Sequence, residues 1–236
     1  MTQATTEPLA TTNLAAPRNS HTPSWPELIS LAIVMALSAD AIPYFGMVII
    51  NSDRPLYAWV LHNLNVPYLY CLLELAFGLL IVLPTARRSG LRLGTLRGHA
   101  WQVAFVVAVP IILTALIYPR LPTRPFTGAS SAMWTVTPPA EDMIFCGYIY
   151  GLLAQRGAKR FVRFLPINPA VLITALLFGL YHAPNMISLP LSYTLFQVLY
   201  TAVGAMWTGM TRVWTGTFLY VTIAHAAVNF IAWRTP

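Results

Sequence analysis

Long apolar runs alternate with short polar segments over most of the chain. A membrane-spanning helix needs about 20 mostly apolar residues, and the pattern predicts about seven such spans. We therefore expect an all-α fold, a polytopic transmembrane helix bundle. The expected spans are 28–50, 64–84, 100–118, 133–154, 165–183, 190–210 and 215–233.

The first 25 residues differ from the rest of the chain. They are rich in Thr, Ala, Pro, Ser and Asn, and they lack the basic start and apolar core of a cleaved signal peptide. We expect residues 1–25 to form a disordered tail and residues 26–236 to form a single transmembrane domain.

Composition agrees with a membrane protein. Of the 236 residues, 57% are hydrophobic and 9% are charged, whereas a soluble domain has about 25% charged residues. The mean hydropathy is +0.62. The net charge of +7 comes from cations in short loops between apolar runs, which is typical of residues that set membrane topology. We expect the lipid bilayer as a partner and no nucleic acid.

The distribution of these cations predicts an orientation. Ten of the 14 Lys and Arg residues fall on the N-terminal side of a seven-span bundle, and the other four fall on the opposite side. Because cytoplasmic loops carry the excess of Lys and Arg, we expect a multi-pass protein of the cell membrane with a cytoplasmic N-terminus. The first side holds Arg18, Arg87, Arg88, Arg92, Arg97, Arg156, Lys159, Arg160, Arg163 and Arg212, and the second holds Arg54, Arg120, Arg124 and Arg234.

Five polar residues inside the expected spans are candidates for a site. Glu141 and Asp142 lie in the fourth span, His182 ends the fifth, and His225 and Asn229 share one face of the seventh. Ionisable groups at membrane depth are costly and usually functional. All five fall in the half of the bundle away from the N-terminus, so we expect a catalytic site toward the outer leaflet.

Two features of this group leave alternatives open. Glu141 and Asp142 are consecutive and point about 100° apart around a helix, so we expect only one of them to lead the chemistry. A Glu and two His also match the ligands of zinc, but the chain has no HExxH motif. We expect no cofactor, with zinc held by Glu141, His182 and His225 as the alternative.

Other polar or reactive residues also lie in expected spans. Asp40 and Glu74 are single acids in these spans. Together with Glu141 they allow another interpretation of the protein, a small transporter or proton relay. Cys71 and Cys146 have no spacing that indicates a disulfide framework or a zinc knuckle, and we interpret Cys71 as a buried thiol.

Three motifs occur in order along the chain. They read Glu141-Asp142-Met143-Ile144-Phe145-Cys146-Gly147, Phe178-Gly179-Leu180-Tyr181-His182, and His225-Ala226-Ala227-Val228-Asn229. This order resembles the CPBP family of intramembrane endopeptidases, which is the CAAX protease and bacteriocin-processing, or Abi, family. The resemblance covers about residues 84–233.

The resemblance implies a glutamate-dependent intramembrane peptidase. In this interpretation Glu141, helped by His182, activates a water as a general base, and His225 and Asn229 stabilise the oxyanion. The expected substrate is a membrane-anchored protein or a precursor peptide. The supporting positions are Asp142, Phe178 and Cys146.

The sequence departs from the family pattern at two positions. Asp142 stands where the family usually has a second Glu, which keeps the charge. Cys146 stands where the family usually has Arg, which removes a cation. This second change favours an alternative function, a catalytically silent family member that acts as a binding or bacteriocin-immunity protein.

Overall fold

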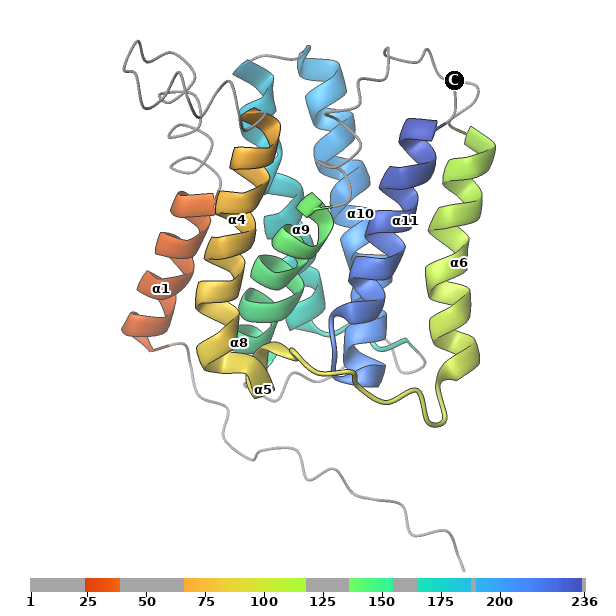
Figure 1. The fold of residues 1–236 in the computed structure, drawn as a ribbon, viewed down its shortest axis with the longest axis horizontal. Helices are drawn as coiled ribbons and strands as arrows, with labels where there is room; N and C mark the ends of the chain where they lie inside the picture. Colours follow the sequence, from red (N-terminus) through yellow and green to blue (C-terminus); the bar gives the residue numbers. More distant parts are fainter. Residues whose placement is uncertain (1–23, 39–65, 118–135, 155–164, 188–189, 235–236) are drawn as a thin grey trace, which may run out of the picture.

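A computed structural model describes residues 24–38, 66–117, 136–154, 165–187 and 190–234, and within these ranges the regular structure is entirely helical (Figure 1). The expected all-helical fold is therefore confirmed for the described part of the chain. Most of the expected tail, Asp40 and the basic loop 155–164 lie outside these ranges.

The helices follow the expected spans closely. The span expected at 28–50 coincides with a helix as far as residue 38, and the rest of it lies outside the described residues. In chain order the elements are α1 (Trp25–Ala36), α4 (Val66–Val82), the 3-10 helix η2 (Leu83–Thr85), α5 (Ala86–Ser89), α6 (Ala100–Ile117), a helix at 136–142, the π-helix η4 (Met143–Ile149), α8 (Tyr150–Ala154), α9 (Pro169–Tyr181), the 3-10 helix η5 (Ala183–Ile187), α10 (Leu191–Thr215) and α11 (Leu219–Arg234).

Local sequence explains where α9 starts and stops. The side chain of Asn168 caps the helix, because its Oδ1 accepts a hydrogen bond of 2.9 Å from the backbone N–H of Val171. Pro169 follows at the first helical position, where its missing N–H costs nothing. Pro184 comes just after the helix end, where a continuing helix would need its N–H. These signals place His182 at the C-terminal cap of α9.

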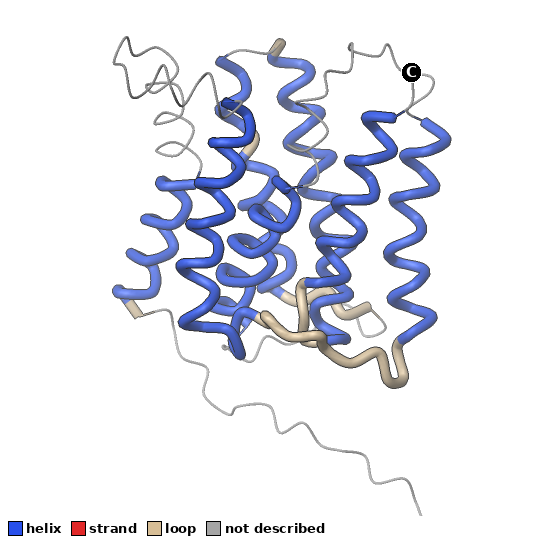
Figure 2. Tube along the Cα trace, viewed as in Figure 1, coloured by secondary structure: helices blue, strands red, loops and turns tan. Residues whose placement is uncertain are grey.

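The helices run alternately in opposite directions and form one bundle (Figure 1). Helix α10 packs along α9, α11 packs against α6 and α10, and η4 packs against α4 and α9. The described loops 90–99 and 216–218 lie at one end of the bundle (Figure 2), whereas α9 ends and α10 begins at the other.

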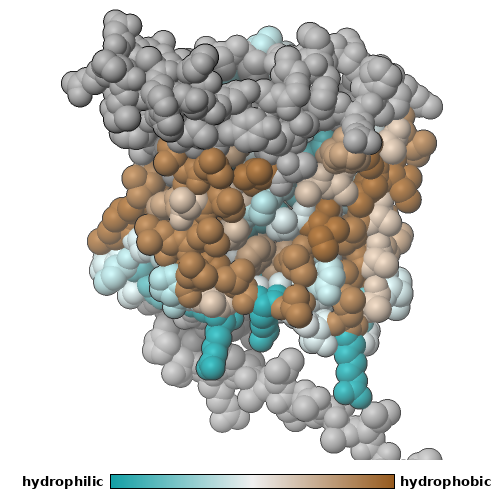
Figure 3. Space-filling view, in the orientation of Figure 1, coloured by the Kyte–Doolittle hydropathy of each residue, from teal (hydrophilic) through white to brown (hydrophobic). Residues whose placement is uncertain are grey.

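The distribution of polar and apolar side chains in this bundle is the reverse of that in a soluble domain. Large apolar side chains face outward, among them Trp101 at 71% exposure and Leu199 at 65%, and they form a broad apolar belt (Figure 3). Two helical stretches of the described residues, α6 and Pro169–Met186, are long and apolar enough to cross a membrane. Several polar side chains are buried instead: Glu74, Glu141, Asp142, Thr194, Thr211 and Arg212.

The π-helix η4 lies at the centre of the bundle, and every residue in it except Tyr148 is buried. The ring of Phe145 packs edge-on against the rings of Phe178 and Tyr181, at centroid distances of 5.0 and 5.2 Å. These aromatic contacts fix the end of α9 against the helix that carries the acidic pair.

Candidate active site

The acidic pair lies at the junction between an α-helix and a π-helix. Glu141 and Asp142 are the last two residues before η4, and they are 6% and 2% exposed. A π-helical turn holds one more residue than an α-helical turn, and such turns are frequent at functional sites. The carboxylates are thus held by a rigid, buried backbone.

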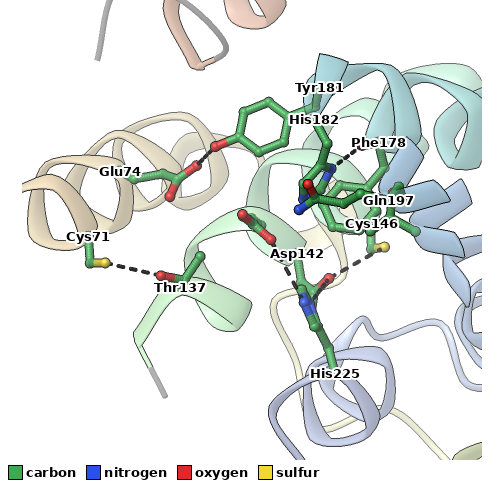
Figure 4. A network of polar contacts seen from close by, with 12 residues as sticks. Cys71, Glu74, Thr137, Asp142, Cys146, Phe178, Tyr181, His182, Gln197 and His225 are labelled. Carbon is green, nitrogen blue, oxygen red and sulfur yellow. Dashed lines mark hydrogen bonds and ion pairs between the residues drawn. The ribbon is translucent and has the colours of Figure 1, made fainter. Parts of the chain in front are cut away.

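Both acids contact the same imidazole. His225 Nδ1 lies 3.4 Å from Asp142 Oδ1, and His225 Nε2 lies 3.8 Å from Glu141 Oε2 (Figure 4). The two side chains diverge, as expected for consecutive residues, but the ring from α11 sits between them. Asp142 therefore orients the ring, and the other ring nitrogen faces Glu141. We expect one acid to lead the chemistry with the other in support, and both acids contact this ring.

His182 is held by its own helix. Its Nδ1 lies 3.0 Å from the carbonyl oxygen of Phe178. A carbonyl only accepts hydrogen bonds, so Nδ1 carries the proton, and Nε2 of the neutral ring is left as an acceptor. The Phe178 ring also contacts both imidazoles edge-on, at 5.1 Å from His182 and 5.8 Å from His225. One aromatic side chain thus separates and positions the two histidines.

Asn229 lies one turn beyond His225 on α11 and is partly exposed. Its carboxamide has no hydrogen-bond partner among the described residues. Residues four apart share a helix face, so this free carboxamide lies on the same side of α11 as His225.

Cys146 has a buried cation beside its backbone, although the family's usual Arg is missing. The guanidinium of Arg212 donates from Nε to Cys146 O at 3.2 Å and from Nη2 to Arg88 O at 3.0 Å. It also lies 5.1 Å from the centre of the Tyr150 ring. Arg212 was expected in a loop, but α10 extends to Thr215, so the residue is inside a helix and buried. The Cys146 thiol lies 3.9 Å from Asp142 Oδ1.

Glu74 and Tyr181 form a second polar contact next to the acidic pair. The Tyr181 hydroxyl donates a 2.5 Å hydrogen bond to Glu74 Oε1. Glu74 is fully buried. An acid inside an apolar run was the signal for Glu74, whereas Tyr181 was missed because a tyrosine in a span carries no signal of its own.

The proposed zinc ligands are only partly brought together. Glu141 and His225 are 3.8 Å apart, and within the described ranges no three His, Cys, Asp or Glu side chains are grouped as a metal site would require. The arrangement suits acid–base chemistry, since a buried carboxylate, two imidazoles and a carboxamide come from three helices.

Comparison with protein families gives one match. The family model of Rce1-like type II CAAX prenyl endopeptidases matches residues 123–231, which include Glu141, His182, His225 and Asn229. Comparison with curated proteins and with solved structures gives no match. Residues 123–231 of this chain therefore match the Rce1-like CAAX endopeptidase family, a family of proteases.

Proposed function

We propose that the chain is a glutamate-dependent intramembrane endopeptidase that hydrolyses a peptide bond of a membrane-associated protein or peptide. One observation carries the proposal: inside the family-matched region, a buried Glu141 faces an imidazole that a second buried acid, Asp142, orients. Paired acid and imidazole groups in a water-poor site are suited to general acid–base catalysis.

In the proposed mechanism Glu141 and His182 hold one water between them. Nε2 of His182 accepts a hydrogen bond from this water, and the Glu141 carboxylate removes its proton. The water oxygen then forms a bond to the carbonyl carbon of the substrate. When the tetrahedral intermediate collapses, the C–N bond breaks and Glu141 passes the proton to the leaving amine.

His225 and Asn229 are the proposed donors to the oxyanion. They lie one turn apart on the same face of α11, and their N–H groups can both reach a substrate carbonyl oxygen. Because Asp142 already holds the His225 ring, this donor is in position before the reaction begins. We propose that the reaction needs no cofactor; zinc bound by Glu141, His182 and His225 is the alternative.

We further propose a bundle of about seven spans with the N-terminus in the cytoplasm. The outward-facing apolar belt supports the spans. The described basic residues Arg87, Arg88, Arg92 and Arg97 gather near loop 90–99, at the end of the bundle where α1 starts. By the excess of cations in cytoplasmic loops, the site then lies toward the outer leaflet.

The substitution Glu141→Gln tests the function. The purified protein in liposomes is given a quenched fluorescent peptide with a prenylated CAAX end, the substrate class that the family name indicates. We expect the rate to fall about 100-fold or more, because the amide cannot accept the proton of the water. Glu27→Gln is the matched control, since Glu27 lies in the first turn of α1, outside the family-matched region, and this variant should cleave like the wild type.

The same experiment distinguishes a peptidase from a catalytically silent family member. A chain that binds the prenylated peptide with equal affinity in wild-type and Glu141→Gln form, and releases no product in either, is a binding or immunity protein. The observation that favours this second function is Cys146 at the place of the family's Arg. Normal turnover by Glu141→Gln would contradict the glutamate mechanism itself.

A further inference from the structure

Helix α4 presents one face to two of the three helices that carry the site. Cys71, Glu74 and Gly78 are spaced at i, i+3 and i+7, so they lie on the same side of the helix. All three are buried. This face precedes the family-matched region, which begins at residue 123.

The first contact of this face is with the helix that carries Glu141. The Cys71 thiol lies 3.0 Å from the hydroxyl of Thr137, one turn before Glu141. At Gly78 the helices approach so closely that an added Cβ would lie 3.2 Å from Ala140 O and 3.2 Å from Met143 Cβ. The glycine therefore lets α4 rest directly on the backbone beside the acidic pair.

The second contact is with the end of α9. Glu74 Oε1 accepts the 2.5 Å hydrogen bond from the Tyr181 hydroxyl (Figure 4). Tyr181 is the last residue of α9, and its ring meets that of His182 edge-on at 5.2 Å. Glu74 thus holds the residue that directly precedes the catalytic imidazole.

Packing alone does not explain a polar acceptor at this position. A buried carboxylate is costly to desolvate, and an apolar side chain of similar volume packs at lower cost. Glu74 Oε2 is buried without a hydrogen-bond partner among the described residues.

We propose that Glu74 is a positioning residue of the peptidase: by holding Tyr181 while the rest of the α4 face holds the helix of Glu141, it sets the separation of Glu141 and His182. This inference rests on the proposed function. It adds α4, which lies outside the region that the family model matches, to the helices that catalysis requires.

The test compares substitutions that keep or remove the acceptor. Glu74→Gln retains an oxygen for the Tyr181 hydroxyl, whereas Glu74→Leu removes it, and Tyr181→Phe removes the donor with the loss of a single oxygen atom. A displacement of about 1 Å between catalytic groups can cost about 100-fold in rate. We therefore expect Glu74→Leu and Tyr181→Phe each to lower kcat about 10- to 100-fold with KM within about twofold, and Glu74→Gln to stay within about threefold of the wild type.

The double variant Glu74→Leu/Tyr181→Phe shows whether the two residues act through one contact. If they do, the kcat of the double variant equals that of the less active single variant. Effects that multiply, a normal kcat in Tyr181→Phe, or a Glu74→Gln as slow as Glu74→Leu would each overturn the proposal. Tyr181→Phe keeps the test valid if Glu74→Leu does not fold.

A second measurement does not depend on peptidase activity. Diethylpyrocarbonate labels histidines, and mass spectrometry gives the rate at each one. His99, which stacks on Trp214 in another part of the bundle, serves as the internal reference. We expect faster labelling of His182 relative to His99 in Tyr181→Phe, because the end of α9 is released. An unchanged ratio would refute positioning even if no substrate were cleaved, whereas a changed ratio with an inactive wild type would refute only the proposed function.

Discussion

At the scale of single residues, the site depends on how one imidazole is held. His225 meets Asp142 through Nδ1 and Glu141 through Nε2, so we propose separate tasks for the two acids. Asp142 contacts only the ring nitrogen that faces away from Glu141, and it therefore acts on the orientation of the ring. This division explains why a shorter acid can stand where the family usually has a second Glu.

The division predicts a difference between two substitutions of Asp142. Asn keeps an oxygen that accepts the hydrogen bond from Nδ1, whereas Leu keeps only the approximate volume. We expect Asp142→Asn to retain at least about a tenth of the wild-type kcat, and Asp142→Leu to lose about 100-fold as the ring turns away. Both are measured with the prenylated peptide in liposomes. Equal rates for the two variants would contradict an orienting role.

At the scale of elements, α9 and α10 form the closest described helix pair around the site. At Gly179 an added Cβ would lie 2.6 Å from the backbone oxygen of Val198 and 2.8 Å from Ala202 Cβ. These contacts are too short for any side chain, so the glycine is required for α9 to lie where it presents His182.

Gly179→Ala should therefore destabilise the bundle. Separating two packed helices costs about 1–3 kcal/mol, and the thermal midpoint in detergent should fall by several degrees. Gly204→Ala on α10 is the matched control, since an added Cβ there meets nothing within 4 Å and alanine favours a helix by about 1 kcal/mol. A Gly179→Ala protein as stable as Gly204→Ala would show that α9 can move without cost.

The apolar pattern predicted the described helices well but not their lateral contacts. Continuous apolar runs set the spans, so α6 and α11 begin within a few residues of the expected positions. The end of α10 was placed too early, because Arg212 looks like a loop residue until the carbonyls of Cys146 and Arg88 are seen to accept its hydrogen bonds. The pairing of Glu74 with Tyr181 joins residues 107 positions apart, and no local pattern carries that information.

At the scale of the whole molecule, the two ends of the bundle differ in charge. The end with loop 90–99 carries arginines, and α9, which His182 caps, ends toward the opposite end. The proposed orientation would place this basic end in the cytoplasm. The orientation decides which compartment supplies the substrate.

Two reporter cysteines test the orientation. In a protein with Cys71→Ser and Cys146→Ser, one variant has Met186→Cys near the site and the other has Leu93→Cys in the loop at the opposite end. Both positions are exposed, at 52% and 81%. We expect an impermeant maleimide to label the Met186→Cys protein on intact cells and the Leu93→Cys protein only after permeabilisation. The reverse pattern would place the site on the cytoplasmic side.

The long-range pairing of buried acids also constrains how the protein is made. In the proposed membrane bundle, Glu74 is synthesised 107 residues before Tyr181, and Asp142 is synthesised 83 residues before His225. At a synthesis rate of about 5–20 residues per second, Glu74 waits on the order of 5–20 s for its partner. During this time the nascent helices hold acids that lipid cannot solvate. Ribosome stalling or truncation before α11 should therefore leave the earlier helices poorly retained in the bilayer and open to quality-control degradation.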